Sequence, residues 1–409
     1  MADAETTMWE GVRRLPRPVW ILCAGSLVNR FGSFVAVFLV LYLRDRGYSI
    51  AESGLVVGFY GIGNVLAAGV GGWVADRLGR RNAIAISMFT SAATLLVLSQ
   101  ARALPLIIVL TTLAGLTGEM YRPASSALLT DLTPAGDRLP AFTLNRLAIN
   151  LGFAVGPATA GLLAEHSFFL IFLGDALTSA VFGVIALVAL PEGIRTPSGA
   201  ERRGEAIRTM LRDHAFSLFL ISSLLGAFVY FQGETTFPLH VKESGLTNAD
   251  YGLLISLNGI AIVLLEFPLV AVLRRFPYRP VLAIGSFLVG LGFALNALAH
   301  DLPALALTVM IWTLGEIVYA PVASAYVADI APEHLRGRYH GAWGLTWGAA
   351  FVLAPVIGAA IFAWNGDALW LICGLLGLAA ALLQLAARPA DRPATAPPEA
   401  LPQQSPDHA

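Results

Sequence analysis

The sequence predicts an all-α membrane protein whose twelve transmembrane helices form two pseudo-symmetric six-helix bundles. Composition is the first reason: 56% of the 409 residues are hydrophobic and 13% are charged, whereas soluble domains carry about 25% charged residues. The second reason is that the apolar residues form twelve runs, each near or above the roughly 20 residues that cross about 30 Å of hydrocarbon. The third is an internal repeat, in which the second half matches the first at a constant offset of 198 residues.

The apolar runs are expected to be helical because a lipid core offers no hydrogen-bond partner to an open backbone. The first run follows the polar residues 1–18 and is too long for the apolar core of a signal peptide, so we interpret it as a span. The predicted spans are 19–43, 51–75, 82–101, 104–129, 142–163, 168–190, 215–240, 250–273, 280–299, 303–328, 340–363 and 368–387.

These spans divide the chain into two units. Residues 1–190 are expected to form the N-terminal bundle, and residues 214–388 the C-terminal bundle. The charged segment 191–213 lacks an apolar run and is interpreted as a cytoplasmic linker. Residues 389–409, rich in Pro, Ala and Gln, are predicted to form a disordered cytoplasmic tail.

The basic residues predict the orientation of the chain. With both termini in the cytoplasm, cytoplasmic segments hold 19 of the 26 Lys and Arg residues, outer loops hold 4, and 3 lie within spans. This asymmetry follows the positive-inside rule, so we expect a multi-pass protein with both termini cytoplasmic. The net charge of −1 provides no overall field for nucleic acid, and no nucleic-acid partner is expected.

Polar positions make the internal repeat specific. Residues of the fourth and fifth spans recur in the tenth and eleventh without a gap: Tyr121, Pro123, Asp131, Arg138 and Pro157 as Tyr319, Pro321, Asp329, Arg336 and Pro355. Because a repeat of six spans preserves orientation, the two bundles are related by an axis along the membrane normal. This arrangement favours a substrate cavity between the bundles, opened to each side in turn.

A charged loop joins spans 2 and 3, with the sequence Gly72-Trp-Val-Ala-Asp76-Arg77-Leu-Gly79-Arg80-Arg81. Gly72 would let helices approach closely and Gly79 would permit a tight turn. Charge-assisted pairs are expected from the side chains of Asp76, Arg77 and Arg81.

This loop resembles the loop signature of the major facilitator superfamily. The resemblance implies the twelve-helix fold of that superfamily and a bacterial cytoplasmic membrane location. It also implies that the loop latches the two bundles at the cytoplasmic edge, with an acid at the inner end of span 4. Asp131 occupies that place.

Span 5 contains a second motif, formed by Gly152, Gly156, Pro157 and Gly161. It resembles the span-5 motif of drug/proton antiporters, with Ala160 where a second glycine is usual. Ordinary packing of small residues between helices is the alternative interpretation.

Ionisable residues within spans cost several kcal/mol unless they are paired or wetted, so each is a functional candidate. Six are predicted to lie at mid-span: Arg30, Glu119, Arg122, Asp175, Glu234 and Glu316. Five of them fall on spans 1, 4, 7 and 10, which line the cavity in the superfamily that the chain resembles.

Proton coupling is assigned to the acidic members of this set. Glu234 and Glu316 have no basic residue in their own spans and are the preferred carriers, with Glu119 and Asp175 as further candidates. Glu119 lies three residues before Arg122 and can pair with it instead. Near the inner end of span 8, Glu266 is expected to pair with Arg274.

The substrate cavity is predicted to combine the two arginines with aromatic side chains. Its predicted lining is Arg30, Arg122, Phe34, Phe38, Tyr121, Phe231, Tyr319 and Trp312. Neither a metal site nor a phosphate-binding loop is evident, and histidines are scattered, so we expect a non-enzymatic transporter that uses the proton gradient and no cofactor.

The sequence therefore predicts a secondary transporter, acting as a monomer in lipid, that expels small apolar or cationic compounds in exchange for protons. Proton-coupled import of peptides or another small metabolite is the alternative. The segment Asn29-Arg30-Phe31-Gly32 resembles part of the first-span motif of peptide importers, without the glutamates that precede it there.

Overall fold

The computed structural model describes residues 11–193, 213–273, 275–332 and 335–386. Within these ranges, twelve helical segments are long and apolar enough to cross a membrane, which confirms the predicted number of spans. The predicted tail and most of the predicted linker lie outside the described residues.

The N-terminal half contains spans 1 to 6. They are α2 (Arg17–Phe31) with α3 (Phe34–Asp45), α4 (Ile50–Leu78), α5 (Arg80–Gln100), α6 (Leu104–Glu119) with α7 (Tyr121–Leu132), α8 (Arg138–His166) and α9 (Phe168–Ala189).

The C-terminal half contains spans 7 to 12. They are α11 (His214–Tyr230) with α12 (Gln232–Thr235) and α13 (Phe237–Glu243), α14 (Asn248–Leu273), α15 (Tyr278–Ala294) with η2 (Leu295–Leu298), α16 (Leu302–Ile330), α17 (Arg336–Trp364) and α18 (Gly366–Ala386).

Spans 1, 4 and 7 are interrupted. Span 1 breaks at Gly32 and Ser33, where a Cβ on Gly32 would lie 1.7 Å from Thr178 Oγ1 of α9. Span 4 breaks at Met120, and span 7 breaks on both sides of the four-residue helix α12. An interrupted span is tolerated where its backbone is buried in protein or lines a cavity.

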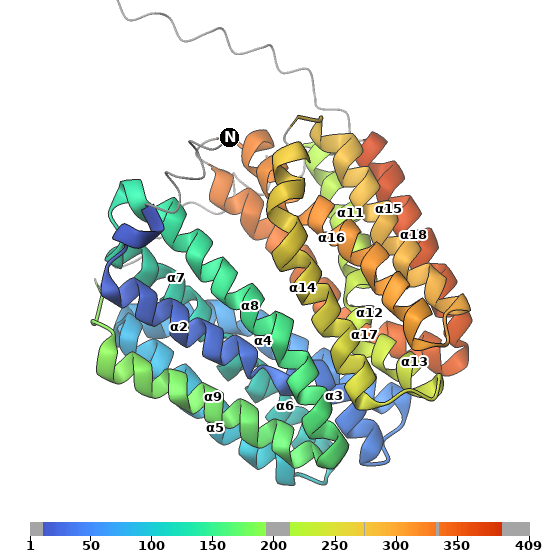
Figure 1. Cartoon of the computed structure of the whole chain (residues 1–409), viewed down its shortest axis with the longest axis horizontal. Coiled ribbons are helices and arrows are strands. Elements are labelled where there is room, and N and C mark those ends of the chain that lie inside the picture. The colour runs from blue at the N-terminus through green and yellow to red at the C-terminus, as the bar shows by residue number, and fades with distance from the viewer. Residues whose placement is uncertain (1–10, 194–212, 274, 333–334, 387–409) are drawn as a thin grey trace, which may run out of the picture.

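The two halves meet through α4 with α17 and through α8 with α14 (Figure 1). Glycines allow these pairs to approach backbone to backbone. A Cβ added at Gly54 of α4 would lie 2.5 Å from the Pro355 carbonyl oxygen of α17. A Cβ at Gly252 of α14 would lie 2.3 Å from the Pro157 carbonyl oxygen of α8. No side chain fits in either place without moving backbone.

Following the predicted orientation, we call the end of the molecule with Arg17, Leu78 and Leu132 the inner end. The opposite end, with Asp45 and Glu243, is the outer end. The halves are packed together at the outer end. Tyr251 of α14 is fully buried there, and its hydroxyl lies 3.2 Å from the Val37 carbonyl oxygen of α3, in the other half.

Toward the inner end, the close approach of α4 and α17 is lost. A Cβ added at Gly69 or Gly72 of α4, or at Gly341 or Gly344 of α17, would meet no atom within 4 Å. The pair α8 and α14 stays connected further inward, through an ion pair between Arg146 and Glu266. The structure is therefore closed at the outer end and more open at the inner end.

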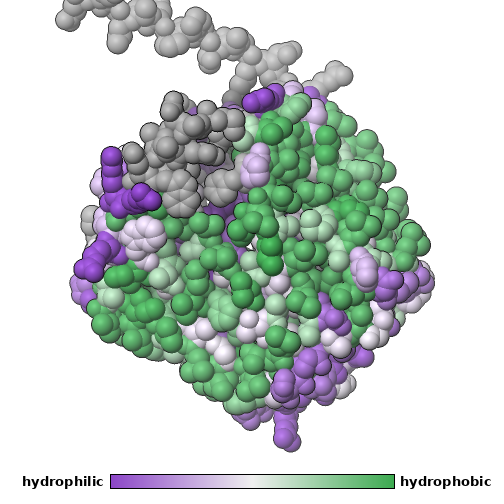
Figure 2. Space-filling model, viewed as in Figure 1, coloured by the Kyte–Doolittle hydropathy of each residue, from purple (hydrophilic) through white to green (hydrophobic). Residues whose placement is uncertain are grey.

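The surface shows a broad hydrophobic face with hydrophilic residues at its two ends (Figure 2). Many large apolar side chains of the protein are exposed, including Val188 and Leu298, each 81% exposed. An apolar area of this extent is expected where lipid covers the protein.

Candidate transport site

A charge cluster lies where spans 1 and 4 are interrupted. Arg30 is near the end of α2, Glu119 ends α6, and Arg122 lies in the first turn of α7. Arg30 Nη2 is 3.6 Å from Glu119 Oε1, and Arg122 Nε is 2.5 Å from Glu119 Oε2. The predicted Glu119–Arg122 contact is therefore present, and the cluster as a whole carries one excess positive charge.

Arg30 retains unused hydrogen-bonding capacity within this cluster. Its side chain is only 13% exposed, and in the described part of the chain its Nε and Nη2 have no hydrogen-bond partner. Tyr60 and Tyr121 are close enough to interact with it electrostatically. A buried guanidinium with free donors can bind a further acceptor, whether from the protein or from a ligand.

Glu316 belongs to the C-terminal half and is held by neutral groups of that same half. It lies in α16 and accepts hydrogen bonds from Tyr230 Oη at 3.3 Å and from Asn258 Nδ2 at 3.0 Å. Asn258 also donates to Thr313 Oγ1 at 2.9 Å, which fixes the orientation of the amide. Across the described residues, no basic side chain is recorded in an ion pair with Glu316. The side chain remains partly exposed.

Glu234 lies on α12, the short helix between the two breaks of span 7. It is partly exposed, and its carboxylate forms no hydrogen bond or ion pair with another described residue. Arg30, Glu119 and Glu316 are all within its electrostatic range. The structure thus brings together the predicted charges of spans 1, 4, 7 and 10.

Asp175 is within electrostatic range of Arg30, but its carboxylate has a structural contact of its own. Its Oδ2 accepts the backbone N–H of Val35 at 3.1 Å, so it caps the first turn of α3 beyond the break in span 1. Only 8% of Asp175 is exposed. A carboxylate that satisfies free N–H groups at a helix start stabilises that helix.

Because of this contact, two substitutions of Asp175 can distinguish a role in helix capping from a role in proton transfer. We expect Asp175→Asn to retain transport, because an amide oxygen can still accept the Val35 N–H. In contrast, Asp175→Ala should destabilise the protein by about 1 kcal/mol, the usual cost of removing a helix cap. Thermal unfolding and transport assays of both variants test this. Loss of proton coupling in the folded Asn variant would show that Asp175 carries a proton.

Four of the six aromatic residues predicted for the cavity are core residues instead. Phe34, Phe38, Tyr121 and Trp312 are 3%, 1%, 2% and 3% exposed. Trp312, for example, stacks on Phe293 with ring centroids 5.4 Å apart. Burial between helices fixes these rings, so they are unavailable to a ligand in this conformation. Phe231 and Tyr319 are partly exposed.

A different aromatic cluster adjoins the acidic residues. Phe231 contacts Phe351 and Trp347, with ring centroids 4.6 Å and 5.9 Å apart, and Tyr230 also contacts Trp347. Tyr60 of the N-terminal half contacts Phe351 across the interface between the two halves (the seam), with ring centroids 6.0 Å apart. All five residues are partly exposed. Only Phe231 was predicted; the sequence signal for the others is that they lie on spans 2, 7 and 11 at the depth of the charges.

The loop between spans 2 and 3 forms the expected charge-assisted pair at Arg81 and a further pair at Arg80. Gly79 has a φ of 87°, as a tight turn requires. Arg80, rather than Asp76, Arg77 or Arg81, forms an ion pair with Asp131.

The remaining charges of this loop lie apart from one another. Arg81 pairs with Glu192 at 2.9 Å, and Arg77 lies over the Trp73 ring at 4.5 Å. Asp76 is exposed. The predicted close approach at Gly72 is absent in this conformation and falls at Gly71, where a Cβ would lie 2.2 Å from the Met120 carbonyl oxygen. Asp76 is within electrostatic range of Arg80 in the next span.

The span-5 motif packs against both halves. Gly152 and Gly156 approach the backbone of α2, with added Cβ atoms 2.7 Å from the Leu27 and 2.5 Å from the Phe31 carbonyl oxygen. Gly161 approaches the backbone of Asn248 on α14 in the other half. The motif therefore allows α8 to pack closely against α2 and, across the seam, against α14.

The predicted Glu266–Arg274 pair depends on Arg274, which lies outside the described residues. Among the residues described, Glu266 pairs with Arg146 of the opposite half. The two halves come close enough along α8 and α14 for the opposite charge to be supplied across the seam, which one span's sequence does not reveal.

Comparison with known proteins agrees with this architecture. The sequence matches the Major Facilitator Superfamily over residues 22–249 and 235–407. It is 28% identical over 348 residues to the uncharacterized MFS-type transporter YqjV of Bacillus subtilis (strain 168), covering 83% of this chain and 85% of that protein. It is 27% identical over 389 residues to multidrug resistance protein MdtH of Aeromonas hydrophila, covering 92% and 96%.

A solved structure shows the same fold at low identity. A POT family transporter in complex with a thioalcohol-conjugated peptide superposes with a TM-score of 0.77 at 17% identity, covering 92% of this chain and 98% of that one. Twelve spans, an internal six-span repeat and a family match across both halves lead to one conclusion: this chain belongs to the major facilitator superfamily of secondary transporters.

Proposed function

We propose that this protein exports small apolar or cationic compounds across a bacterial cytoplasmic membrane in exchange for protons. Both termini are cytoplasmic, the protein acts as a monomer, and the proton gradient is its energy source, with no cofactor. The site lies between the two halves and is exposed to each side of the membrane in turn, which moves the compound across.

One observation carries the proposal: Glu316 is bound by the neutral donors Tyr230 and Asn258 rather than by a cation. A carboxylate in such a setting can gain a proton without breaking an ion pair. Once deprotonated, it can bind a cationic ligand in the place of the proton. Competition of this kind on one carboxylate is the simplest basis for exchange, and intramembrane acids commonly act as proton relays.

Glu234 adds a link between charge and conformation. Arg30 is paired with Glu119 in its own half and is within electrostatic range of Glu234 in the other half. A deprotonated Glu234 attracts Arg30 across the seam, whereas a protonated Glu234 does not. Protonation therefore changes the relative stability of arrangements that differ in the distance between the halves.

The aromatic cluster supports a flat or cationic substrate. Phe231, Trp347 and Phe351 lie beside the two acids, and aromatic faces bind cations and apolar rings. The likeness to multidrug resistance protein MdtH supports the same substrate class.

Transport by reconstituted protein tests the proposal. With the membrane potential clamped, an acidic lumen should drive ethidium, an aromatic cation, into proteoliposomes that contain DNA to trap it. Outward proton flow then accompanies inward ethidium flow, whichever way the protein is inserted. Uptake no faster than in protein-free liposomes would overturn the proposal for this class of cation.

A second candidate is proton-coupled import of a dipolar compound such as a peptide. It is favoured by the placement of Arg30 and Arg122 on one half and of Glu234 and Glu316 on the other, because a zwitterion can bridge opposite charges. A labelled dipeptide should then accumulate when the outside of the liposomes, rather than the lumen, is acidic. The two candidates thus require opposite gradients.

A further inference from the structure

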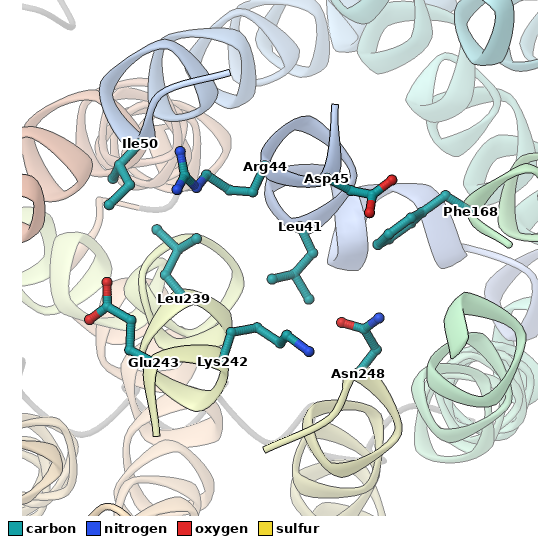
Figure 3. A pocket seen from close by; sticks show the side chains of 9 residues that line it. All are labelled: Leu41, Arg44, Asp45, Ile50, Phe168, Leu239, Lys242, Glu243 and Asn248. Atoms are coloured by element: carbon teal, nitrogen blue, oxygen red, sulfur yellow. The ribbon is translucent and has the colours of Figure 1, made fainter. Parts of the chain in front are cut away.

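A cavity of about 320 Å³ lies at the outer end of the seam (Figure 3). The two halves supply matching parts of its lining: Leu41, Arg44 and Asp45 from α3, and Leu239, Lys242 and Glu243 from α13. Leu41 and Leu239 are each 4% exposed and form an apolar floor. None of the acids of the transport site lines the cavity, and it belongs to no motif identified above.

These two sets of three residues are images of one another in the internal repeat. Each residue of α13 lies 198 positions after its counterpart in α3. The repeat thus places a cation at Arg44 and Lys242 and an anion at Asp45 and Glu243. Leu41 and Leu239 correspond in the same way.

The backbone that follows each set is also the same. Gly47 and its counterpart Gly245 have φ values of 86° and 80°. The next helix begins with a reciprocal cap in both halves, between Ser49 and Glu52 and between Thr247 and Asp250. Equivalent turns hold the two charged ends in equivalent positions.

A twofold relation between two cation–anion sequences has a direct consequence. The cation of each half lies across from the anion of the other half. In Figure 3, Arg44 and Glu243 extend toward Ile50, whereas Asp45 and the Lys242 ammonium extend toward Phe168 and Asn248. The charges are complementary in both directions across the seam.

One of the two facing pairs, Arg44 with Glu243, shows an electrostatic interaction in this structure. Partial burial raises the pKa of Glu243, and Arg44 opposes that rise, so Arg44 is within electrostatic range. Arg44 donates to the Tyr48 carbonyl oxygen of its own loop at 2.6 Å. Within the described ranges, no ion pair is recorded for any of the four groups.

We propose that Arg44–Glu243 and Asp45–Lys242 are reciprocal ion pairs that form as the outer end closes fully and separate as it opens. The apolar floor of Leu41 and Leu239 excludes water beneath them. This outer gate is independent of which compound is carried and of which carboxylate carries the proton.

Charge reversal tests the gate, with Leu41→Cys as the reporter in a variant lacking Cys23 and Cys373. In intact cells, a membrane-impermeant maleimide should label this buried position slowly. R44E places a second acid opposite Glu243 and should speed labelling about fivefold, the scale set by partly exposed ion pairs. The double reversal R44E/E243R should restore slow labelling. In the same way, D45K should speed labelling and the double reversal D45K/K242D should restore the slow rate.

Arg102→Glu is the matched control, because it makes the same charge change at the outer end, on a residue outside the cavity lining. Its labelling should equal that of the reporter alone. Equal rates for R44E and Arg102→Glu would overturn the gate, as would failure of both double reversals to restore protection. Should R44E not fold, R44Q and the folded double reversals give the same comparison. Labelling needs neither substrate nor a proton gradient, so failure of the proposed function would leave this result intact.

Discussion

Replacing Glu316 by Gln should reduce proton-driven ethidium transport to less than about a tenth of the wild-type rate, because an amide cannot carry the proton. The substitution preserves the shape of the side chain. The glutamine oxygen can still accept from Tyr230 and Asn258, which now hold the Glu316 carboxylate at 3.3 Å and 3.0 Å. Folding and insertion should therefore be unchanged, and the loss should be specific to coupling.

Two further measurements identify the cause of the loss. Exchange of ethidium for ethidium without a pH gradient should fall much less in Glu316→Gln than gradient-driven transport does, because it needs no change in protonation and the aromatic cluster still binds the ring. The neutralising control Asp367→Asn removes an exposed acid at the outer end and should transport normally. A wild-type rate of gradient-driven transport in Glu316→Gln would show that the proton travels on another group, and Glu234→Gln would then be the decisive variant.

Adding one methyl group at Gly252 should also have a large effect. A Cβ there would lie 2.3 Å from the Pro157 carbonyl oxygen and 3.2 Å from the Gly161 Cα of the opposite half. Neither is a flexible side chain, so α8 and α14 must separate. Overpacking of this kind costs about 2 kcal/mol, which favours separation of the outer ends by roughly 30-fold. Transport should fall accordingly, because the cycle requires the closed outer end.

Gly341→Ala provides the comparison for this variant. It makes the same chemical change on α17, where a Cβ meets no atom within 4 Å. Because alanine favours helix over glycine, its thermal stability should be unchanged or higher and its transport normal. Equal transport by Gly252→Ala and Gly341→Ala would contradict the view that the α8–α14 contact is needed for closure.

Hydropathy was sufficient to predict the twelve spans, because a membrane requires long apolar helices whatever their packing. It did not predict where spans 1 and 7 break. No proline marks the break after Phe31; the helix ends there because Gly32 packs on Thr178 and because Asp175 supplies a cap from another span. Both causes are tertiary contacts, which a local sequence pattern does not contain.

The charged residues of the site were easier to predict from the sequence than its aromatic residues. Glu234 and Glu316 are rare in apolar surroundings, so position alone marks them as functional candidates. Phenylalanine and tryptophan are common in spans, and only the rotation of each helix decides whether a ring lies at the seam or in the core. Phe38 packs against Tyr251 within the sealed outer end, whereas Trp347 and Phe351 lie beside the acids.

The buried hydroxyl of Tyr251 has a kinetic consequence. It lies 3.2 Å from both the Val37 carbonyl oxygen of one half and the Gly233 carbonyl oxygen of the other. Exposing the site to the outside must hydrate this phenol and uncover the apolar rings around it, which the empty carrier has no binding energy to offset. The unloaded molecule should therefore rest with its outer side shut and open rarely, which limits the wasteful passage of protons when no compound is present.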